Sequence, residues 1–333
     1  MSELRKDPIT GRWVVVTTER QKRLSDFRIE PTAPKPVEFC PFCGGNEDKT
    51  PSEVLAYRQN GGAPNTAGWD VRVVPNPVPA LQVEGSVEPH GDGIFDRLAG
   101  IGAHEVIIET PDHMQTLATL PEASVANVLW AFRERVVDLR QDRRLQSILV
   151  FKNHGASAGA MLDHSHSQLI ALPIVPRHLR EELDGARQHH QFKERCVFCD
   201  IIDQELRGEQ RVVIESADFV ALAPYAPRFP FETWVLPRQH RASFEDAPRH
   251  EIESLSRILK DVLQRVNHAL LSPPYNLVLH SSPFYEPTAP FYHWHIEIMP
   301  VLMKVPGFEW GSGFYINPVA PEEAARVLRD MRL

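Results

Sequence analysis

Two amphipathic helices dominate the pattern of hydrophobic and polar positions along the chain. The first begins at Pro121, a residue type favoured at the first position of a helix. In both, apolar residues recur every three or four positions, which predicts one buried face per helix. The stripes are Val125, Val128, Leu129, Phe132, Val136 and Leu139 in the first helix, and Ile252, Leu255, Leu259, Val262, Leu263 and Val266 in the second.

Short apolar runs that predict strands surround the two helices in the same order. "VRVVPNPVPAL" and "HEVIIETPDH" precede the first helix, as "FVALAPYAP" and "ETWVLPRQH" precede the second. "SILVFKNHG" and "YNLVLHSS" follow the helices, and each half closes with a His-x-His strand, "HSHSQLIALP" or "HWHIEIMP". His113 and His164 are 51 positions apart, and His240 and His293 are 53 apart. We interpret the chain as a duplication.

The duplication predicts an α+β fold made of two copies of one unit, each an antiparallel sheet with packed helices. The first unit is assigned to residues 1–178 and the second to residues 190–333. The polar stretch around residues 175–195 is the expected junction. With 333 residues the chain is long enough for two such domains.

Composition and charge narrow the class of protein. A formal net charge of −8 argues against a protein that binds nucleic acid or an anionic membrane, which needs a basic face. The N-terminal "MSELRKDPITG" has no apolar signal region, and no run approaches the ~18 apolar residues of a membrane span. We therefore expect a cytoplasmic protein.

The four cysteines form two similar pairs, Cys40–Cys43 and Cys196–Cys199, each with two residues between them. In a reducing compartment this spacing favours a metal over a disulfide, although redox pairs or unrelated buried cysteines remain alternatives. Histidines at matching places complete two Cys₂His₂ sets, which predict closed, structural sites and about two zinc ions per chain. The sets are Cys40, Cys43, His113 and His164, and Cys196, Cys199, His240 and His293. The other histidines, His104 among them, are taken as ordinary.

Residues 153–172, "NHGASAGAMLDHSHSQLIAL", predict a strand, a glycine-rich turn and a second strand. Small residues allow a phosphate to approach the backbone closely. If His164 binds zinc, His166 stays free to attack phosphorus as a neutral imidazole. Gln168, on the same strand face, is placed to donate to a phosphate oxygen.

The second half provides an internal control for this candidate site. Its matching His295 has Glu297 where the first half has Gln168, and a carboxylate repels phosphate. The preceding "HSSPFYEPTAPFY" is rich in proline and contains no glycine. We therefore expect one active site per chain, in the first half.

Taken together, these motifs resemble the galactose-1-phosphate uridylyltransferase branch of the histidine-triad superfamily. The likeness runs nearly end to end, from "RKDPITGRWVVVTTERQKR" through "CPFCGGNE" to "GFEWGSGFYINPVAPEEAARVLR". The resemblance implies two tandem histidine-triad-like units, the second without activity. It also implies transfer of a nucleoside monophosphate from a nucleotide sugar to a histidine, and then to a second sugar 1-phosphate.

The resemblance also assigns residues by position. It makes His166 the nucleophile and Gln168 its phosphate-binding companion. The sugar-binding segment is expected to reach the site across a homodimer. The further expected contacts are Arg20 and Arg23 to phosphates, Asn76 to base or ribose, Asn153 and Gly159 in the phosphate loop, and Phe308 and Glu309 to the sugar.

Departures from the family pattern concern the substrate. Ser165 replaces the usual proline between the histidines, and Met161 replaces a loop serine. These changes, the second cysteine pair and the 307–317 tail look more like a sister group that handles ADP-glucose and phosphate. On family frequency alone, uridylyl transfer between UDP-glucose and galactose 1-phosphate is placed first, with ADP-glucose phosphorolysis as the alternative.

Two other functions remain open. Some histidine-triad proteins hydrolyse dinucleoside polyphosphates by letting water attack the histidine adduct. A zinc-binding module without catalysis is the other; nucleic-acid readers of that kind carry basic faces with stacking aromatics, which an acidic chain fits poorly.

Overall fold

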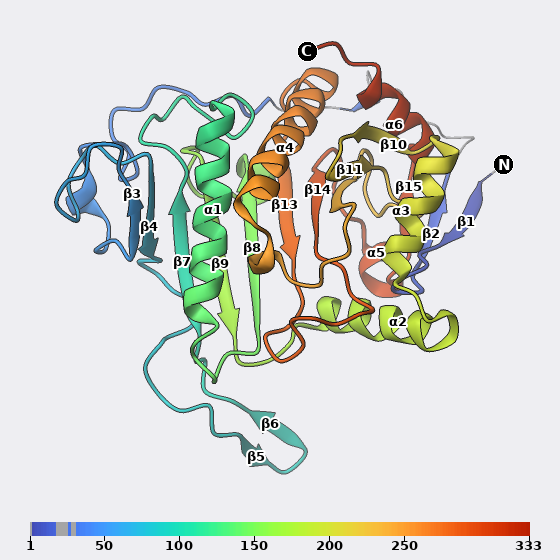
Figure 1. Ribbon diagram of the computed structural model, residues 1–333, viewed down its shortest axis with the longest axis horizontal. Helices are drawn as coiled ribbons and strands as arrows, with labels where there is room; N and C mark the ends of the chain where they lie inside the picture. The colour runs from blue at the N-terminus through green and yellow to red at the C-terminus, as the bar shows by residue number, and fades with distance from the viewer. Residues whose placement is uncertain (1, 18–25, 28–30) are drawn as a thin grey trace.

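One sheet of ten strands forms the centre of the protein (Figure 1). The structure is a computed structural model, and it describes residues 2–17, 26–27 and 31–333. All neighbouring strands in this sheet are antiparallel, which confirms the predicted α+β class. Across the sheet the order is β3 (Leu55–Tyr57), β4 (Val71–Pro75), β7 (Ala103–Ile108), β9 (His166–Leu172), β8 (Ser147–His154), β13 (Tyr275–His280), β14 (His295–Pro300), β12 (Thr233–Pro237), β11 (Phe219–Leu222) and β10 (Val212–Glu215).

The sheet consists of two five-strand halves with the same strand order, as the duplication predicted. Strands β8, β9, β7, β4 and β3 of the first half correspond to β13, β14, β12, β11 and β10 of the second. The halves meet where β8 pairs with β13, with His154 opposite Tyr275 and Val150 opposite Leu279. The sequence analysis predicted two sheets, and this pairing joins them into one.

The two amphipathic helices, α1 (Glu122–Leu139) and α4 (Arg249–Leu270), pack side by side on one face of the sheet (Figure 1). Their apolar stripes are buried in one core that spans both halves, with Val125 and Leu255 fully covered. Helix α1 begins one residue later than predicted, and Pro121 is its N-cap. None of the helices in the described part of the chain is long and apolar enough to cross a membrane.

The opposite face of the sheet is covered differently in the two halves. In the second half, α2 (Arg177–Lys193) and α3 (Val197–Gly208) bury Leu183 and Phe198 against strand residues such as Trp234. The predicted junction is therefore mostly helix α2. In the first half, the segment that carries Cys40 and Phe42 packs against Val106 and Ile108. The first half therefore keeps strand residues accessible where the second half is closed by helices.

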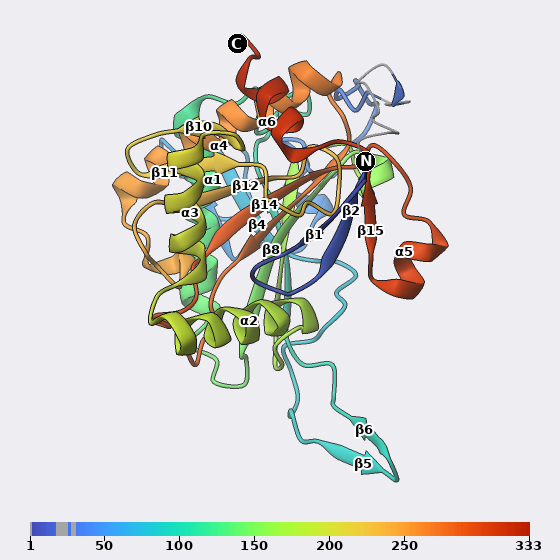
Figure 2. The same cartoon turned by 90° about the vertical axis from the view of Figure 1, so that its right-hand side faces the viewer.

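The remaining elements lie at the edges (Figures 1 and 2). A three-stranded sheet joins the two ends of the chain, because β15 pairs in parallel with β2. A hairpin projects away from the body of the protein (Figure 2). These elements are β1 (Glu3–Lys6), β2 (Trp13–Val16), β15 (Tyr315–Asn317), α5 (Gly307–Ser312) and α6 (Pro321–Arg329), with β5 (His90–Asp92) and β6 (Phe95–Arg97) in the hairpin.

Candidate active site and metal centres

Strand β9 presents His166 and Gln168 on the face of the sheet opposite α1, because side chains alternate along a strand. The ladder places Phe151 of β8 opposite Gln168, and His104 of β7 opposite Ile170. Asn153 lies two residues beyond Phe151, so it shares this face. The register therefore gathers these polar side chains around His166.

His166 is held as a neutral imidazole with one nitrogen free. Its Nδ1 donates to the backbone carbonyl of His164 at 2.7 Å, so the proton is on Nδ1 and Nε2 carries the lone pair. Burial lowers the pKa of His166, and the nearby Lys152 cation lowers it further. The edge of the Phe42 ring lies 5.4 Å from the imidazole, between ring centroids. The arrangement is that of a nitrogen nucleophile at neutral pH.

The glycine loop is a compact turn between β8 and β9. Gly155 has φ +84°, and a Cβ there would lie 2.3 Å from Cγ2 of Thr32, so only glycine fits. The backbone N–H groups of Ala158, Gly159 and Ala160 donate inside the turn. The loop can therefore let a phosphate approach the backbone closely. Its three N–H groups already donate within the turn and are not free to bind the phosphate.

Asn276, on β13 of the second half, supports this loop. Its Nδ2 donates to the Ala158 carbonyl at 2.8 Å and to Oδ1 of Asn153 at 2.9 Å. Asn153 in turn lies 3.4 Å from the Gly159 carbonyl through its own Nδ2. The sequence analysis missed Asn276, because only the pairing of β8 with β13 brings it here.

His104 was taken as an ordinary histidine, but the structure places it in the site. The backbone N–H of Ala80 donates to its Nδ1 at 3.1 Å, so its proton is on Nε2. That Nε2 donates to Oε1 of Gln168 at 2.9 Å, which turns the amide NH₂ of Gln168 away from His104. Asn76 lies 3.0 Å from the same nitrogen through Nδ2, and two donors cannot bond, so its amide stays available to a ligand. The alternation of side chains along the strand that precedes "ETPDH" was the sequence signal that could have identified His104.

Other predicted contact residues lie elsewhere or outside the described residues. Arg20 and Arg23 fall in the part of the chain that the structure does not describe. Phe308 is 56% exposed on α5, while Glu309 is buried and accepts from the Ile316 backbone N–H at 3.0 Å. In both views α5 stands beside β15 and away from β8 (Figures 1 and 2). One chain alone does not bring the predicted sugar segment to His166.

The structure brings the eight predicted metal ligands together in two groups, and within each group the ligand atoms lie within 4.8 Å of one another. In the first group the Sγ–Nδ1 distances are 3.6 Å for Cys40–His164 and 3.7 Å for Cys43–His113. Tetrahedral zinc with its usual bond lengths places sulfur and nitrogen about 3.6 Å apart. His164 donates from Nε2 to the Thr110 carbonyl at 2.7 Å, so its Nδ1 is the ligating nitrogen.

The second group has the same geometry. Sγ of Cys199 lies 3.4 Å from Nδ1 of His240 and 3.6 Å from Nδ1 of His293. His293 donates from Nε2 to the Pro237 carbonyl at 2.9 Å, as His164 does in the first half. Both sets of residues fit a closed tetrahedral zinc site.

A third group of possible metal ligands, which the sequence analysis missed, includes His295. It consists of Glu182, His280, His295 and Glu297. Arg228 forms an ion pair with Glu297, and the guanidinium of Arg228 lies 3.6 Å from Glu232. Burial alone would raise the pKa of Glu297, but Arg228 and His280 lower it to about 2. A cavity of about 10 Å³ remains beside His295, which leaves no room for a nucleotide.

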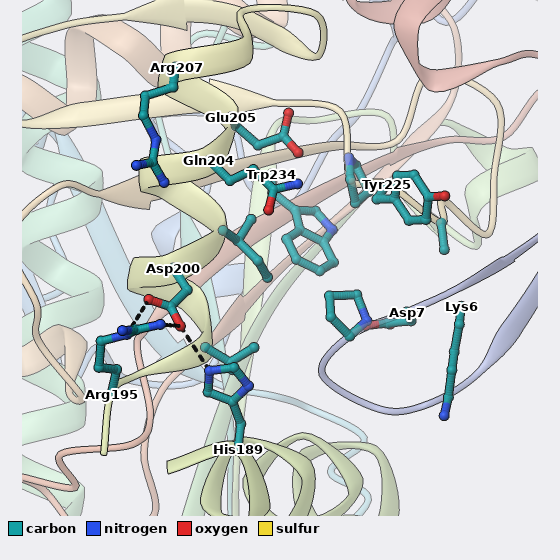
Figure 3. Close-up of a pocket in the computed structure, with 15 residues that line it drawn as sticks. Lys6, Asp7, His189, Arg195, Asp200, Gln204, Glu205, Arg207, Tyr225 and Trp234 are labelled. Atoms are coloured by element: carbon teal, nitrogen blue, oxygen red, sulfur yellow. Dashed lines mark hydrogen bonds and ion pairs between the residues drawn. The ribbon is translucent and has the colours of Figure 1, made fainter. Parts of the chain in front are cut away.

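A larger cavity of about 460 Å³ lies in the second half between α3 and the loop after β1 (Figure 3). Its histidine, His189, bonds to Asp200 at 2.9 Å, and Arg195 bonds to the same carboxylate at 2.9 Å. The side chains of His189, Arg195 and Asp200 thus form hydrogen bonds with one another. No residue of the His166 face lines the cavity. The polar face around His166 is therefore the candidate active site.

Comparison with known proteins places the chain in a family. Two family models match, galactose-1-phosphate uridyl transferase N-terminal domain over residues 1–176 and its C-terminal domain over residues 181–331. ADP-glucose phosphorylase of Arabidopsis thaliana is 38% identical over 99% of this chain and 93% of its own length. Galactose-1-phosphate uridylyltransferase of Thermotoga maritima is 30% identical over 99% of this chain and 98% of its own length.

Among solved structures, the Arabidopsis thaliana ADP-glucose phosphorylase with bound ADP-glucose superposes with a TM-score of 0.84. It is 36% identical, and the match covers 100% of this chain and 99% of that one. The fold and the relatives define a nucleotidyltransferase. The chain belongs to the galactose-1-phosphate uridylyltransferase family.

Proposed function

We propose that the protein moves a nucleoside monophosphate from a nucleotide sugar to an acceptor phosphate by two displacements at His166. In the first, Nε2 attacks the phosphorus next to the nucleoside, and the bond to the sugar 1-phosphate breaks. In the second, an acceptor phosphate oxygen attacks the same phosphorus and releases the histidine. The free Nε2 of a neutral, hydrogen-bonded His166 is the observation that carries this proposal.

Gln168 is the proposed donor to the phosphate oxygens, and Asn76, which the sequence analysis assigned to the base or ribose, is proposed as a second donor. Each presents an amide NH₂ that the hydrogen bonds of its neighbours leave available. Donors that are already oriented stabilise the charge that grows on the oxygens during transfer. Asn153 and Gly159 belong to the same proposed phosphate site through the loop that Asn276 supports.

For the donor we put ADP-glucose first, with inorganic phosphate as acceptor, so that the products are ADP and glucose 1-phosphate. The 38% identity to an ADP-glucose phosphorylase supports this choice, as do Ser165 and Met161. The sequence analysis placed uridylyl transfer to galactose 1-phosphate first. It remains the second candidate, because the family models and a relative at 30% identity carry that name.

Two further elements complete the proposal. Each Cys₂His₂ set would hold one zinc ion as a structural centre, because the sulfur–nitrogen distances fit tetrahedral zinc. A homodimer would bring Phe308 and Glu309 of a second copy to His166. Phe308 and Trp310 are 56% and 77% exposed on α5, which supports such a contact.

Mass spectrometry of the intact protein tests the donor and the covalent step together. The protein is incubated separately with ADP-glucose and with UDP-glucose, and His166→Ala is the control. We expect an added AMP with ADP-glucose that phosphate removes and water removes slowly, and no adduct on the variant. An added UMP would establish the uridylyl donor instead. Rapid release of the adduct by water would indicate a hydrolase, and no adduct with either donor would contradict the proposal.

A further inference from the structure

A buried polar cluster lies directly behind the nucleophile, on the side of the sheet that faces α1. Its members are Glu109, Lys152, Ser165 and Ser167, all at most 2% exposed. Nζ of Lys152 donates to Oε2 of Glu109 at 2.8 Å and to Oγ of Ser165 at 3.1 Å. Both serine hydroxyls donate to the Glu109 carboxylate at 2.6 Å. The cluster is thus an ion pair enclosed by two hydroxyl groups.

The third bond of the Lys152 ammonium connects this cluster to the nucleophile. Nζ donates to the backbone carbonyl of His166 at 2.9 Å. The backbone N–H of Glu109 also donates to the Ser165 carbonyl at 3.2 Å. Two consecutive main-chain carbonyls, those of Ser165 and His166, are therefore hydrogen-bonded to groups of Glu109 and Lys152 with fixed positions. All three ammonium hydrogens of Lys152 have acceptors, so the cluster has one arrangement rather than several.

The second half shows that the fold does not require these polar groups. Stepping along the matching ladders, the equivalent positions are Pro237, Leu279, Trp294 and Ile296. Trp294 fills its place by packing against Phe219 and Phe244, with ring centroids 5.9 and 5.2 Å away. Apolar residues therefore suffice behind the inactive His295. A buried ion pair is often no more stabilising than apolar residues of similar volume.

We propose that Glu109, Lys152, Ser165 and Ser167 are positioning residues that fix the main chain of His166 for attack on phosphorus. This role explains why serine stands between the two histidines, because Ser165 supplies one hydroxyl to the carboxylate and one acceptor to the ammonium. The inference deepens the proposed function and rests on it. A small displacement of a nucleophile is enough to slow a transfer about a hundredfold.

The test removes both charges at once, with Glu109→Gln and Lys152→Met combined, so that no unpaired charge stays buried. We expect the variant to fold, retain its bound metal and bind ADP-glucose with unchanged Kd. Formation of the nucleotidyl-histidine in a single turnover should slow by about tenfold to a hundredfold. Ser165→Ala, a smaller change that leaves the ion pair in place, should slow the same step less.

A matched control makes the same change in another buried ion pair of the first half. Arg135 donates to both carboxylate oxygens of Glu105, at 2.7 and 2.8 Å, and neither residue contacts His166. Glu105→Gln combined with Arg135→Met should leave the single-turnover rate as in the wild type. Equal slowing in both double variants would show a structural effect only and overturn the proposal.

The remaining outcomes separate this inference from the proposed function. A wild-type rate in the folded Glu109→Gln/Lys152→Met variant overturns the positioning role while the function stands. If the wild type forms no adduct with either donor, the proposed function fails. A crystal structure of the double variant then decides, because an unmoved His166 main chain overturns the positioning role and a displaced one supports it. If the double variant does not fold, the Ser165→Ala rate decides, and no slowing overturns the proposal.

Discussion

The two halves of the chain have the same strand arrangement but carry different side chains around His166 and His295. Around His166 the open face of the sheet carries amides and an imidazole, and the corresponding positions around His295 carry charged groups. In order, Gln168, Asn153 and His104 correspond to Glu297, His280 and Glu232. The amides leave donors for a phosphate, whereas the carboxylates of the second half pair with cations of the chain itself.

Both histidines are buried, His166 with 7% of its surface exposed, but the groups that cover them differ. His295 is 1% exposed, and its ring stacks on His280 at 4.8 Å and lies 5.1 Å from the ring of Phe198 on α3. His166 uses Nδ1 for its bond to the His164 carbonyl, which leaves Nε2 free. Under the proposed mechanism, the His-x-His strand alone does not make a nucleophile, and the charges of the neighbouring side chains and the groups that cover the strand decide.

The largest expected difference between the halves is at the two histidines. His166→Ala should lower kcat by at least about a thousandfold with little loss of stability, because it removes the nucleophile. His295→Ala should leave kcat within a few-fold but lower the free energy of unfolding by about 2 kcal/mol, because it leaves a buried gap. Exchange rates and denaturant unfolding measure both. A reversal of the two results would place the active site in the second half.

Metal removal should also affect the halves differently. Cys40→Ala is expected to lose one zinc per chain and to lower kcat by a hundredfold or more, since His164 holds the strand that carries His166. Cys196→Ala should lose one zinc and lower the melting temperature with a much smaller effect on kcat. Elemental analysis, calorimetry and exchange rates are the measurements. Full zinc content in either variant would contradict the assigned ligands.

Exchanging one residue between the halves tests the charge argument. Gln168→Glu gives the first half the residue of the second, and it should lower kcat by about a hundredfold through repulsion of phosphate and loss of a donor. Glu297→Gln should leave kcat unchanged and cost about 3 kcal/mol of stability, because Arg228 loses the nearer of its two carboxylate partners. An active Gln168→Glu enzyme would show that position 168 does not contact phosphate.

The smallest expected effect lies where the second half touches the site of the first. Asn276→Ala removes one hydrogen bond to the glycine loop and one to Asn153, and kcat should fall by about tenfold while the melting temperature changes little. The control is Asn267→Ala on α4, an asparagine whose Oδ1 is buried and has no hydrogen-bond partner among the described residues. Unchanged kinetics in Asn276→Ala would mean that the loop holds its shape without the second half.

Much of the fold was predictable because it depends on local patterns. The stripes of α1 and α4 follow from spacing, and the repeated motifs predict the same succession of strands along the chain in each half. The pairing of β8 with β13 was not predictable, because an edge strand has the same sequence pattern whether its free edge faces solvent or pairs with another strand. Asn276 was missed for the same reason.

In the site, residues near motifs were easier to predict than residues that act through partners. His166 and the eight cysteines and histidines of the two metal sets stand in recognisable spacings. His104 was passed over, because its role depends on the Ala80 N–H and the Gln168 amide, which only the folded chain brings to its two nitrogens. The Lys152–Glu109 pair is likewise 43 positions apart in sequence.

The pairing of β8 with β13 also affects the rate of folding and the exposure of strand edges before folding is complete. It joins residues more than a hundred positions apart, and such long-range pairing slows folding, because a large loop closes before the contact is made. Until it forms, each half exposes the unpaired backbone of a long, largely apolar strand, which is a template for association with other chains. While the protein is being synthesised, one edge of β8 stays unpaired in the first half until residues 275–280 arrive.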